Sequence, residues 1–180
     1  MVSLILCLAC AGARGQETIS QLQAGVITNT SEVDGVNSGY RISFTFEFKP
    51  SPEKLTVGAT IGVMRLSVVN SVTSNVGPLS ITTMPALIVT RYMFGSEKLN
   101  GFVRVGLGLH SSTMASTGDF SITGGSRLGA ASTISGGVMC WVSRRVFLGA
   151  DLEWMWKTND FAFVRSNSLG IASLSAGVKF

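Results

Sequence analysis

The last twelve residues of the chain, Leu169 to Phe180, read LGIASLSAGVKF and decide the fold. Counted back from the terminal Phe180, every second residue is small or apolar: Val178, Ala176, Leu174, Ala172 and Gly170. The positions between them include Lys179, Ser175 and Ser173. A period of two predicts a β-strand with one apolar face and one more polar face. Such a strand needs partners, so the rest of the chain must supply more strands of the same kind.

The clearest partner is Gly39 to Lys49, which reads GYRISFTFEFK. Its large apolar residues occupy every second position: Tyr40, Ile42, Phe44, Phe46 and Phe48. The charged residues of the stretch fall on the opposite face. A strand with bulky apolar side chains on one face and charges on the other is typical of transmembrane barrels, with the apolar face towards lipid.

The same alternation divides the chain into eight strands, which we expect at residues 17–29, 39–49, 54–69, 79–94, 101–110, 128–142, 145–157 and 169–180. The apolar residues change face near Arg65, which predicts a β-bulge there. The connections alternate in length, with long ones at 30–38, 70–78, 111–127 and 158–168 and short ones at 50–53, 95–100 and 143–144. Long loops at one end and short turns at the other predict an up-and-down barrel.

The composition agrees with strands that face lipid. The chain of 180 residues is 46% hydrophobic and only 13% charged, against about a quarter in soluble domains. Its mean hydropathy is +0.40, yet the longest charge-free stretch, residues 66–90, is broken by polar residues and Pro78. Helices and closed barrels are the structures that satisfy the backbone within a bilayer. A soluble β-sandwich or lipocalin-like barrel is the alternative, with the apolar rows turned inward.

The terminal Phe180 after an alternating strand, together with the eight-strand pattern, resembles the small eight-stranded outer-membrane barrels of bacteria, of the OmpX and OmpA transmembrane-domain type. The resemblance covers residues 16–180. It implies an all-β, antiparallel up-and-down transmembrane barrel in the outer membrane of a Gram-negative bacterium. It also implies contact with outer-membrane lipids and lipopolysaccharide, and recognition of the C-terminal strand by the barrel-assembly machinery.

Eight charged residues fall on the inward face of the expected strands: Arg41, Glu47, Lys49, Arg91, Arg104, Asp151, Glu153 and Lys157. An eight-stranded barrel is just wide enough for side chains to fill it. Buried charges need partners, so mixed signs predict a plug of ion pairs, with a narrow channel as the alternative. We expect Glu47 to pair with Arg41 or Arg104. Asp151 and Glu153 are expected to pair with Arg91 or Arg104.

Aromatic residues gather near the expected strand ends: Tyr40, Tyr92, Phe94, Trp154, Trp156 and Phe180. Aromatic rings at both ends of transmembrane segments are typical of the membrane–water interface. We therefore interpret these residues as two interfacial girdles.

His110 is the single histidine and is followed by Ser111 and Ser112. A histidine base beside a serine nucleophile is the arrangement used in acyl transfer, and small outer-membrane barrels that deacylate lipid A use such residues. The asparagine of that family's motif is missing, because Thr113 follows. The sequence does not identify the acid that would orient the imidazole; Asp119 and Asp160 are the candidates. We expect His110 to be a solvated residue at the barrel rim.

Residues 1–15 are expected to be an export signal, with residues 16–180 as the barrel domain. The run is short and apolar and ends in Ala13-Arg14-Gly15, which has the form of a signal peptidase site. No basic residue precedes Leu4, so either Met1 is an internal or misassigned start and the basic region is truncated, or this signal is atypical. Cys10 leaves lipidation as an alternative.

The sequence thus predicts a non-enzymatic protein with a structural or surface-interaction role. We expect neither a cofactor nor a metal site, because no cluster of histidine and cysteine or phosphate-binding loop is present. We expect no nucleic-acid partner, because the net charge is only +4 and the longest basic run is Arg144-Arg145.

Overall fold

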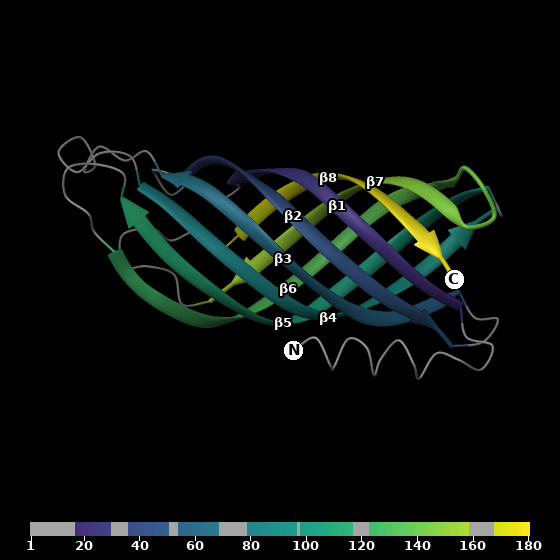
Figure 1. Cartoon of the computed structure of the whole chain (residues 1–180), viewed down its shortest axis with the longest axis horizontal. Helices are drawn as coiled ribbons and strands as arrows, with labels where there is room; N and C mark the ends of the chain where they lie inside the picture. The colour runs from purple at the N-terminus through teal and green to yellow at the C-terminus, as the bar shows by residue number, and fades with distance from the viewer. Residues whose placement is uncertain are drawn as a thin grey trace.

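The computed structural model describes residues 17–29, 36–50, 54–68, 79–96, 98–116, 123–158 and 168–180. Eight antiparallel strands form one closed barrel, in which every strand pairs with its neighbours in sequence and β1 pairs with β8 (Figure 1). The strands are β1 (Glu17–Asn29), β2 (Val36–Lys49), β3 (Leu55–Val68), β4 (Leu79–Gly95), β5 (Leu99–Ser116), β6 (Thr123–Trp141), β7 (Val146–Lys157) and β8 (Ser168–Lys179). The expected eight-stranded up-and-down barrel is confirmed.

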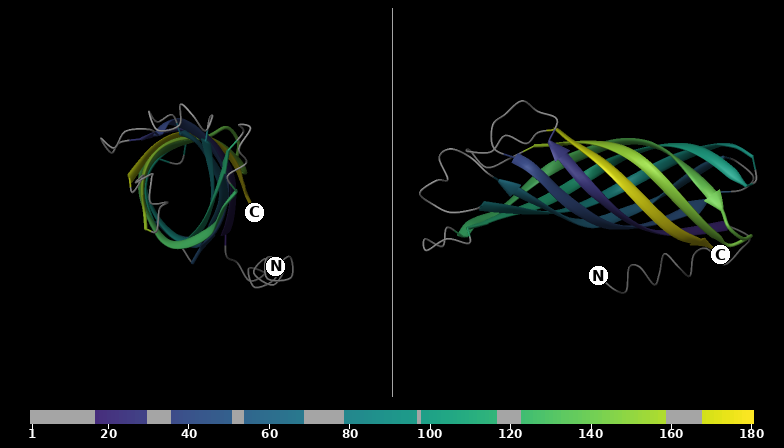
Figure 2. Two further views of the ribbon diagram at one scale, coloured as in Figure 1. Left: turned by 90° about the vertical axis from the view of Figure 1, so that its left-hand side faces the viewer. Right: turned by 90° about the horizontal axis from the view of Figure 1, so that it is seen from above.

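The two ends of the barrel differ in their connections. At one end of the barrel, which we call the long-connection end, the strands are joined by residues 30–35, 69–78, 117–122 and 159–167. At the other end, which we call the short-turn end, they are joined by short turns. Viewed along its axis, the barrel is a closed ring (Figure 2). No helix in the described part of the chain is long and apolar enough to cross a membrane. The expected export signal, residues 1–15, lies outside the described residues.

The strands β5 and β6 are longer than the sequence pattern indicates. The expected loop over residues 111–127 was wrong at both ends, because residues 111–116 and 123–127 belong to these two strands. The serine, threonine and glycine residues here show no clear alternation of hydropathy. Backbone pairing does not need apolar side chains, so the ladder continues where the pattern stops. The turn from β4 to β5 is likewise tighter than expected and contains Gly95 at φ +114°, a left-handed conformation that favours glycine.

The expected bulge near Arg65 is absent. Arg65 pairs with Tyr40 on β2 and with Thr82 on β4, and the register is continuous on both sides of it. Met64 and Leu66 point into the barrel and are buried, whereas Arg65 is exposed. The apolar residues change face because the interior itself becomes apolar towards the long-connection end. The irregularity of this strand pair lies instead in β2, between Val36 and Ser38.

The apolar rows face outward and the charges face inward. Four large apolar side chains in the middle of the strands are 70–71% exposed: Ile88, Leu107, Leu152 and Leu174. Inside, Arg91, Arg104 and Glu47 are at most 1% exposed. A soluble lipocalin-like barrel would have the opposite arrangement, with its apolar rows inside.

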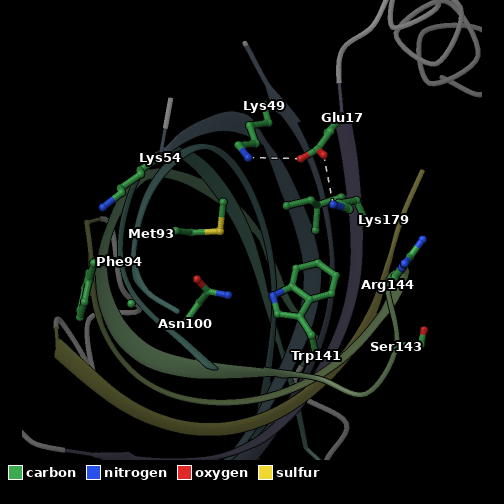
Figure 3. A pocket seen from close by; sticks show the side chains of 12 residues that line it. Glu17, Lys49, Lys54, Met93, Phe94, Asn100, Trp141, Ser143, Arg144 and Lys179 are labelled. Atoms are coloured by element: carbon green, nitrogen blue, oxygen red, sulfur yellow. Dashed lines mark hydrogen bonds and ion pairs between the residues drawn. The ribbon is translucent and has the colours of Figure 1, made fainter. Parts of the chain in front are cut away.

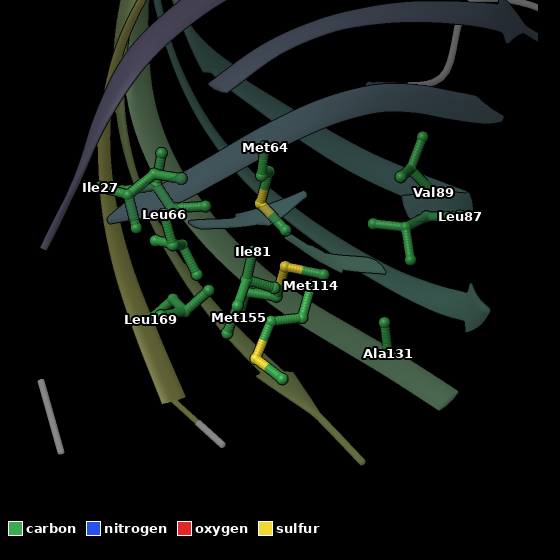
Figure 4. Close-up of a cluster of buried hydrophobic side chains, with 11 residues drawn as sticks. Ile27, Met64, Leu66, Ile81, Leu87, Val89, Met114, Ala131, Met155 and Leu169 are labelled. Carbon is green, nitrogen blue, oxygen red and sulfur yellow. The ribbon is translucent and has the colours of Figure 1, made fainter. Parts of the chain in front are cut away.

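The interior of the barrel is layered along its axis. Near the short-turn end lies a layer of Ile19, Phe102, Met139 and Phe147. A second apolar layer towards the long-connection end is larger (Figure 4) and contains Ile27, Met64, Leu66, Ile81, Leu87, Val89, Met114, Ala131, Met155, Leu169 and Ile171. Six of the inward charges lie between these two layers: Arg41, Glu47, Arg91, Arg104, Asp151 and Glu153. On β1 the inward Gln21 and Gln23 separate Ile19 from Ile27, and on β7 Asp151 and Glu153 separate Phe147 from Met155.

Candidate functional site: the charged layer of the lumen

The charged layer is built around Glu153 of β7. Its carboxylate forms ion pairs with Arg41 of β2 and with Nη2 of Arg104 of β5, the latter at 2.9 Å. Asp151 lies 3.6 Å from Arg104 Nη2. The carboxamide of Gln23 on β1 links the two sides, because its Nε2 donates to Asp151 at 2.9 Å and its Oε1 accepts from Arg104 at 3.2 Å. The network thus joins four strands across the lumen.

A second group centres on Arg91 of β4. Its Nη2 lies 3.0 Å from Glu47 Oε1, and its Nη1 lies 3.2 Å from Met139 Sδ. The guanidinium stacks over the ring of Phe102, 4.8 Å from the centroid. Thr56 completes the shell by donating to Glu47 Oε2 at 2.9 Å. Arg91 therefore joins the charged layer to the apolar layer beside it.

The expected partners were partly wrong. Glu47 pairs with Arg91, not with Arg41 or Arg104, and Glu153 has Arg41 as an additional partner. Strand alternation fixes which side chains point inward, but the stagger between strands fixes their height along the axis. Thr56 lies directly beside Arg91 in the β3–β4 register, so the side chain that bonds Glu47 also lies next to Arg91.

Two of the eight expected lumen charges lie away from this layer. Lys49 is at the short-turn end, where its Nζ lies 3.3 Å from Glu17 Oε2. Lys157 is buried near the long-connection end of β7. Among the described residues, no group of histidine, cysteine, aspartate or glutamate is arranged to hold a metal ion.

Several polar residues of the layer were not among the expected site residues. Gln21, Gln23, Thr45, Thr56 and Thr60 are all buried in the lumen. Thr45 and Thr60 share a hydrogen bond of 2.8 Å. These residues occupy inward-facing positions of their strands, as the lumen charges do. Uncharged polar residues at every second position of a strand are therefore the signal that could have identified them.

The expectation of a solvated His110 at the rim was wrong. His110 is 1% exposed and points into the barrel, because β5 continues for six residues beyond it. Its Nε2 donates to the backbone oxygen of Thr158 at 2.7 Å, so in the neutral ring Nδ1 accepts from the Ser112 hydroxyl at 3.1 Å. Ser112 in turn contacts the Thr83 hydroxyl at 2.9 Å. Ser112 is itself fully buried, and Asp119 and Asp160 lie outside the described residues.

Gly129 of β6 makes this contact possible. A Cβ at this position would lie 2.4 Å from the Thr158 oxygen and 2.5 Å from His110 Nε2. We expect Gly129→Ala to displace the imidazole and to lower the free energy of unfolding by about 1–3 kcal/mol, as for other overpacked sites. Urea unfolding in phospholipid vesicles measures the change.

Gly136 provides the matched control for Gly129. It lies on the same strand, and a Cβ there would meet only the Phe102 oxygen, at 3.7 Å. Gly136→Ala should therefore leave the stability within about 0.5 kcal/mol of the wild type. Equal stability of the two variants would contradict the role assigned to Gly129.

The six expected interfacial aromatic residues all point outward and are exposed. Tyr40, Trp154 and Trp156 lie towards the long-connection end, and Tyr92, Phe94 and Phe180 lie at the short-turn end. The indole N–H of Trp154 donates to the Ser168 hydroxyl at 2.6 Å. The outer face thus carries aromatic rings at both ends of an aliphatic band.

The barrel is similar to several solved structures. Neisserial surface protein A is 13% identical, with a TM-score of 0.64, and the match covers 93% of this chain and 100% of that one. Ail, the attachment invasion locus protein of Yersinia pestis, is 16% identical, with a TM-score of 0.52 and coverages of 92% and 99%. The outer-membrane enzyme PagL is 14% identical, with a TM-score of 0.51 and coverages of 89% and 98%.

No protein-family model and no curated protein sequence matches the chain. Sequence identities of 13–16% support a shared fold but do not support a shared activity. The closed ring of eight antiparallel strands and the structural matches together show that this chain has the fold of the small eight-stranded outer-membrane barrels.

Proposed function

We propose that this chain is a non-enzymatic protein of the bacterial outer membrane that acts at the cell surface through its four long connections. The observation that carries the proposal is the combination of an apolar outer face with a lumen sealed by charged and apolar layers. The outer face suits a bilayer, and the filled lumen leaves the connections as the part able to meet a partner at the cell surface. Outer-membrane lipids and lipopolysaccharide would surround the barrel.

The filled lumen supports a structural role over a channel. Ions would have to cross two apolar layers and a set of paired charges, and dry apolar constrictions oppose conduction. We expect no steady single-channel conductance when the purified protein is inserted into planar bilayers. A steady conductance would contradict this reading.

The geometry around His110 supports a non-enzymatic role. The Ser112 hydroxyl is fully buried and faces the lumen, whereas a lipid acyl ester would approach from the outer face. Mass spectrometry of lipid A from cells that express the chain tests the alternative. A loss of acyl chains that depends on His110 would overturn the proposal.

The surface role is tested by exchanging the long connections. Residues 30–35, 69–78, 117–122 and 159–167 carry Glu32, Asp34, Asp119, Asp160 and Arg165, and also Phe120, Phe161 and Phe163. We would replace each segment by a glycine–serine linker of equal length and express the variants in a Gram-negative host. Attachment of the cells to epithelial monolayers should fall, while the barrel keeps its shift on unboiled gels. Unchanged attachment in all variants, or attachment no greater than that of cells without the protein, would contradict the proposal.

The terminal Phe180 is proposed to act during assembly and not in the folded barrel. Its backbone pairs with Thr18 at 2.9 and 3.2 Å, but its ring is 74% exposed. We expect Phe180→Ala to change the free energy of unfolding by less than about 0.5 kcal/mol while reducing the amount of protein in the outer-membrane fraction of cells. Equal losses in vitro and in cells would assign the ring a structural role instead.

A further inference from the structure

The barrel has a cup at its short-turn mouth, on the outer side of the apolar layer that contains Ile19 and Phe147 (Figure 3). The cup has a volume of about 450 Å³, which is within the range of small-molecule sites. Its floor is partly apolar, because Met93 and Trp141 pack against that layer. The lumen is sealed below it, so the cup is a blind site and not the entrance of a channel.

The described lining is strongly cationic. It contains four cations, Lys49, Lys54, Arg144 and Lys179, and one carboxylate, Glu17. Glu17 lies between two of the lysines, with Lys179 Nζ 3.1 Å from Oε1 and Lys49 Nζ 3.3 Å from Oε2. This geometry shows that the two ammonium groups can hold one anionic group between them. Lys54 and Arg144 have no ion pair within the described residues.

Further hydrogen-bond donors point into the cup. The indole N–H of Trp141 on β6 and the carboxamide of Asn100 on β5 are directed towards its centre (Figure 3), and neither has a side-chain hydrogen bond within the described part of the chain. Lys179 Nζ also lies 5.5 Å from the centroid of the Trp141 ring. By contrast, the head groups of Lys54 and Arg144 point away from the centre.

We propose that this cup binds an organic phosphate, with the phosphate group at Lys49 and Lys179 and an adjoining flat face on Trp141. Ammonium groups and N–H donors from several strands match the oxygens of a phosphate. The excess of positive charge in the lining favours an anion over a neutral or cationic ligand. The phosphate can come from a soluble molecule or from the headgroup of an anionic phospholipid. The site is independent of the long connections, which lie at the other end.

The test follows the indole N–H signals of the three tryptophans by NMR. The full chain from Gln16 to Phe180 is labelled with ¹⁵N and placed in phosphatidylcholine nanodiscs, and Trp141→Phe identifies the signal of Trp141. Titration with phenyl phosphate and glycerol 3-phosphate forms one arm, and nanodiscs that also contain phosphatidylglycerol form the other. We expect a saturable shift of the Trp141 signal, while the outward Trp154 and Trp156 stay in place. A shift in one arm alone assigns the source of the phosphate.

Two variants and a matched control make the result specific. Lys49→Gln should weaken binding about fivefold, and Glu17→Gln, which removes the competing carboxylate, should tighten it by about the same factor. Lys54→Gln is the control, because Lys54 flanks the same turn but points outward, and it should change binding less than about twofold. The proposal is overturned if neither arm shifts Trp141, if Lys49→Gln and Lys54→Gln weaken binding equally, or if Glu17→Gln fails to tighten it.

Discussion

Replacing Glu153 by glutamine is expected to lower the free energy of unfolding by about 3–5 kcal/mol, the range for breaking a buried ion pair from one side. Glu153 is the carboxylate that Arg41 and Arg104 share, and both guanidinium groups are almost fully buried. Without it, Arg41 loses its ion-pair partner among the described residues, and Asp151, at 3.6 Å, becomes the remaining described ion-pair partner of Arg104. Urea unfolding in phospholipid vesicles, followed by tryptophan fluorescence, measures the loss.

Glu17→Gln is the matched control for this prediction. Glu17 also lies between two cations, but its side chain is 44% exposed. Exposed ion pairs contribute little, so we expect a loss below about 1 kcal/mol. Equal losses at the two sites would mean that water reaches the charged layer. The double variant Arg41→Leu/Glu153→Leu should recover much of the stability lost in Glu153→Gln, because apolar residues of similar size can replace a buried pair.

Replacing Leu107 by arginine is expected to destabilise the barrel in bilayers by about 2–4 kcal/mol, the cost of a cation on the lipid face near the midplane. Leu107 is 70% exposed, lies in the middle of β5 and pairs with Ile88, which is exposed to the same extent. The same vesicle assay measures the change. A soluble barrel would tolerate arginine at this position, since the side chain would reach water.

Leu99→Arg controls for the position along the strand. Leu99 is also exposed, but it is the first residue of β5 at the short-turn end. There the cost should fall to about 0–1 kcal/mol, because the arginine reaches the interface. Equal effects at the two positions would contradict an apolar band that crosses a membrane between the aromatic girdles.

The sequence predicted the architecture because every strand contains a stretch in which apolar and polar residues alternate with a period of two. In β2 and β7, the apolar residues at every second position identify the outward face of the strand without information from neighbouring strands. Alternation fails where side chains carry no hydropathy signal, as in residues 111–116, and therefore His110 was placed at the rim instead of inside. It also fails where the lumen turns apolar, so Met64 and Leu66 suggested a bulge that does not exist.

The pairing of the lumen charges needed information that one strand does not hold. Whether Glu47 meets Arg91 or Arg104 depends on the stagger of β2, β3, β4 and β5, which is a property of the closed ring. The contact between His110 and Thr158 similarly depends on Gly129 lying opposite His110 in the register. The spacing of residues along the chain predicts neither the partner of Glu47 nor the contact between His110 and Thr158.

The bonds across the lumen have a mechanical consequence. A ladder of backbone hydrogen bonds holds each strand to its neighbours but does little to keep a thin tube round when lipids press on it from the side. The contacts of Glu153 with Arg41 and Arg104, and of Gln23 with Arg104, connect strands that are not neighbours in the sheet. Such contacts across the lumen resist flattening of the barrel. The long connections are thereby mounted on a stiff frame, which keeps the spacing of their attachment points constant whatever residues the connections themselves contain.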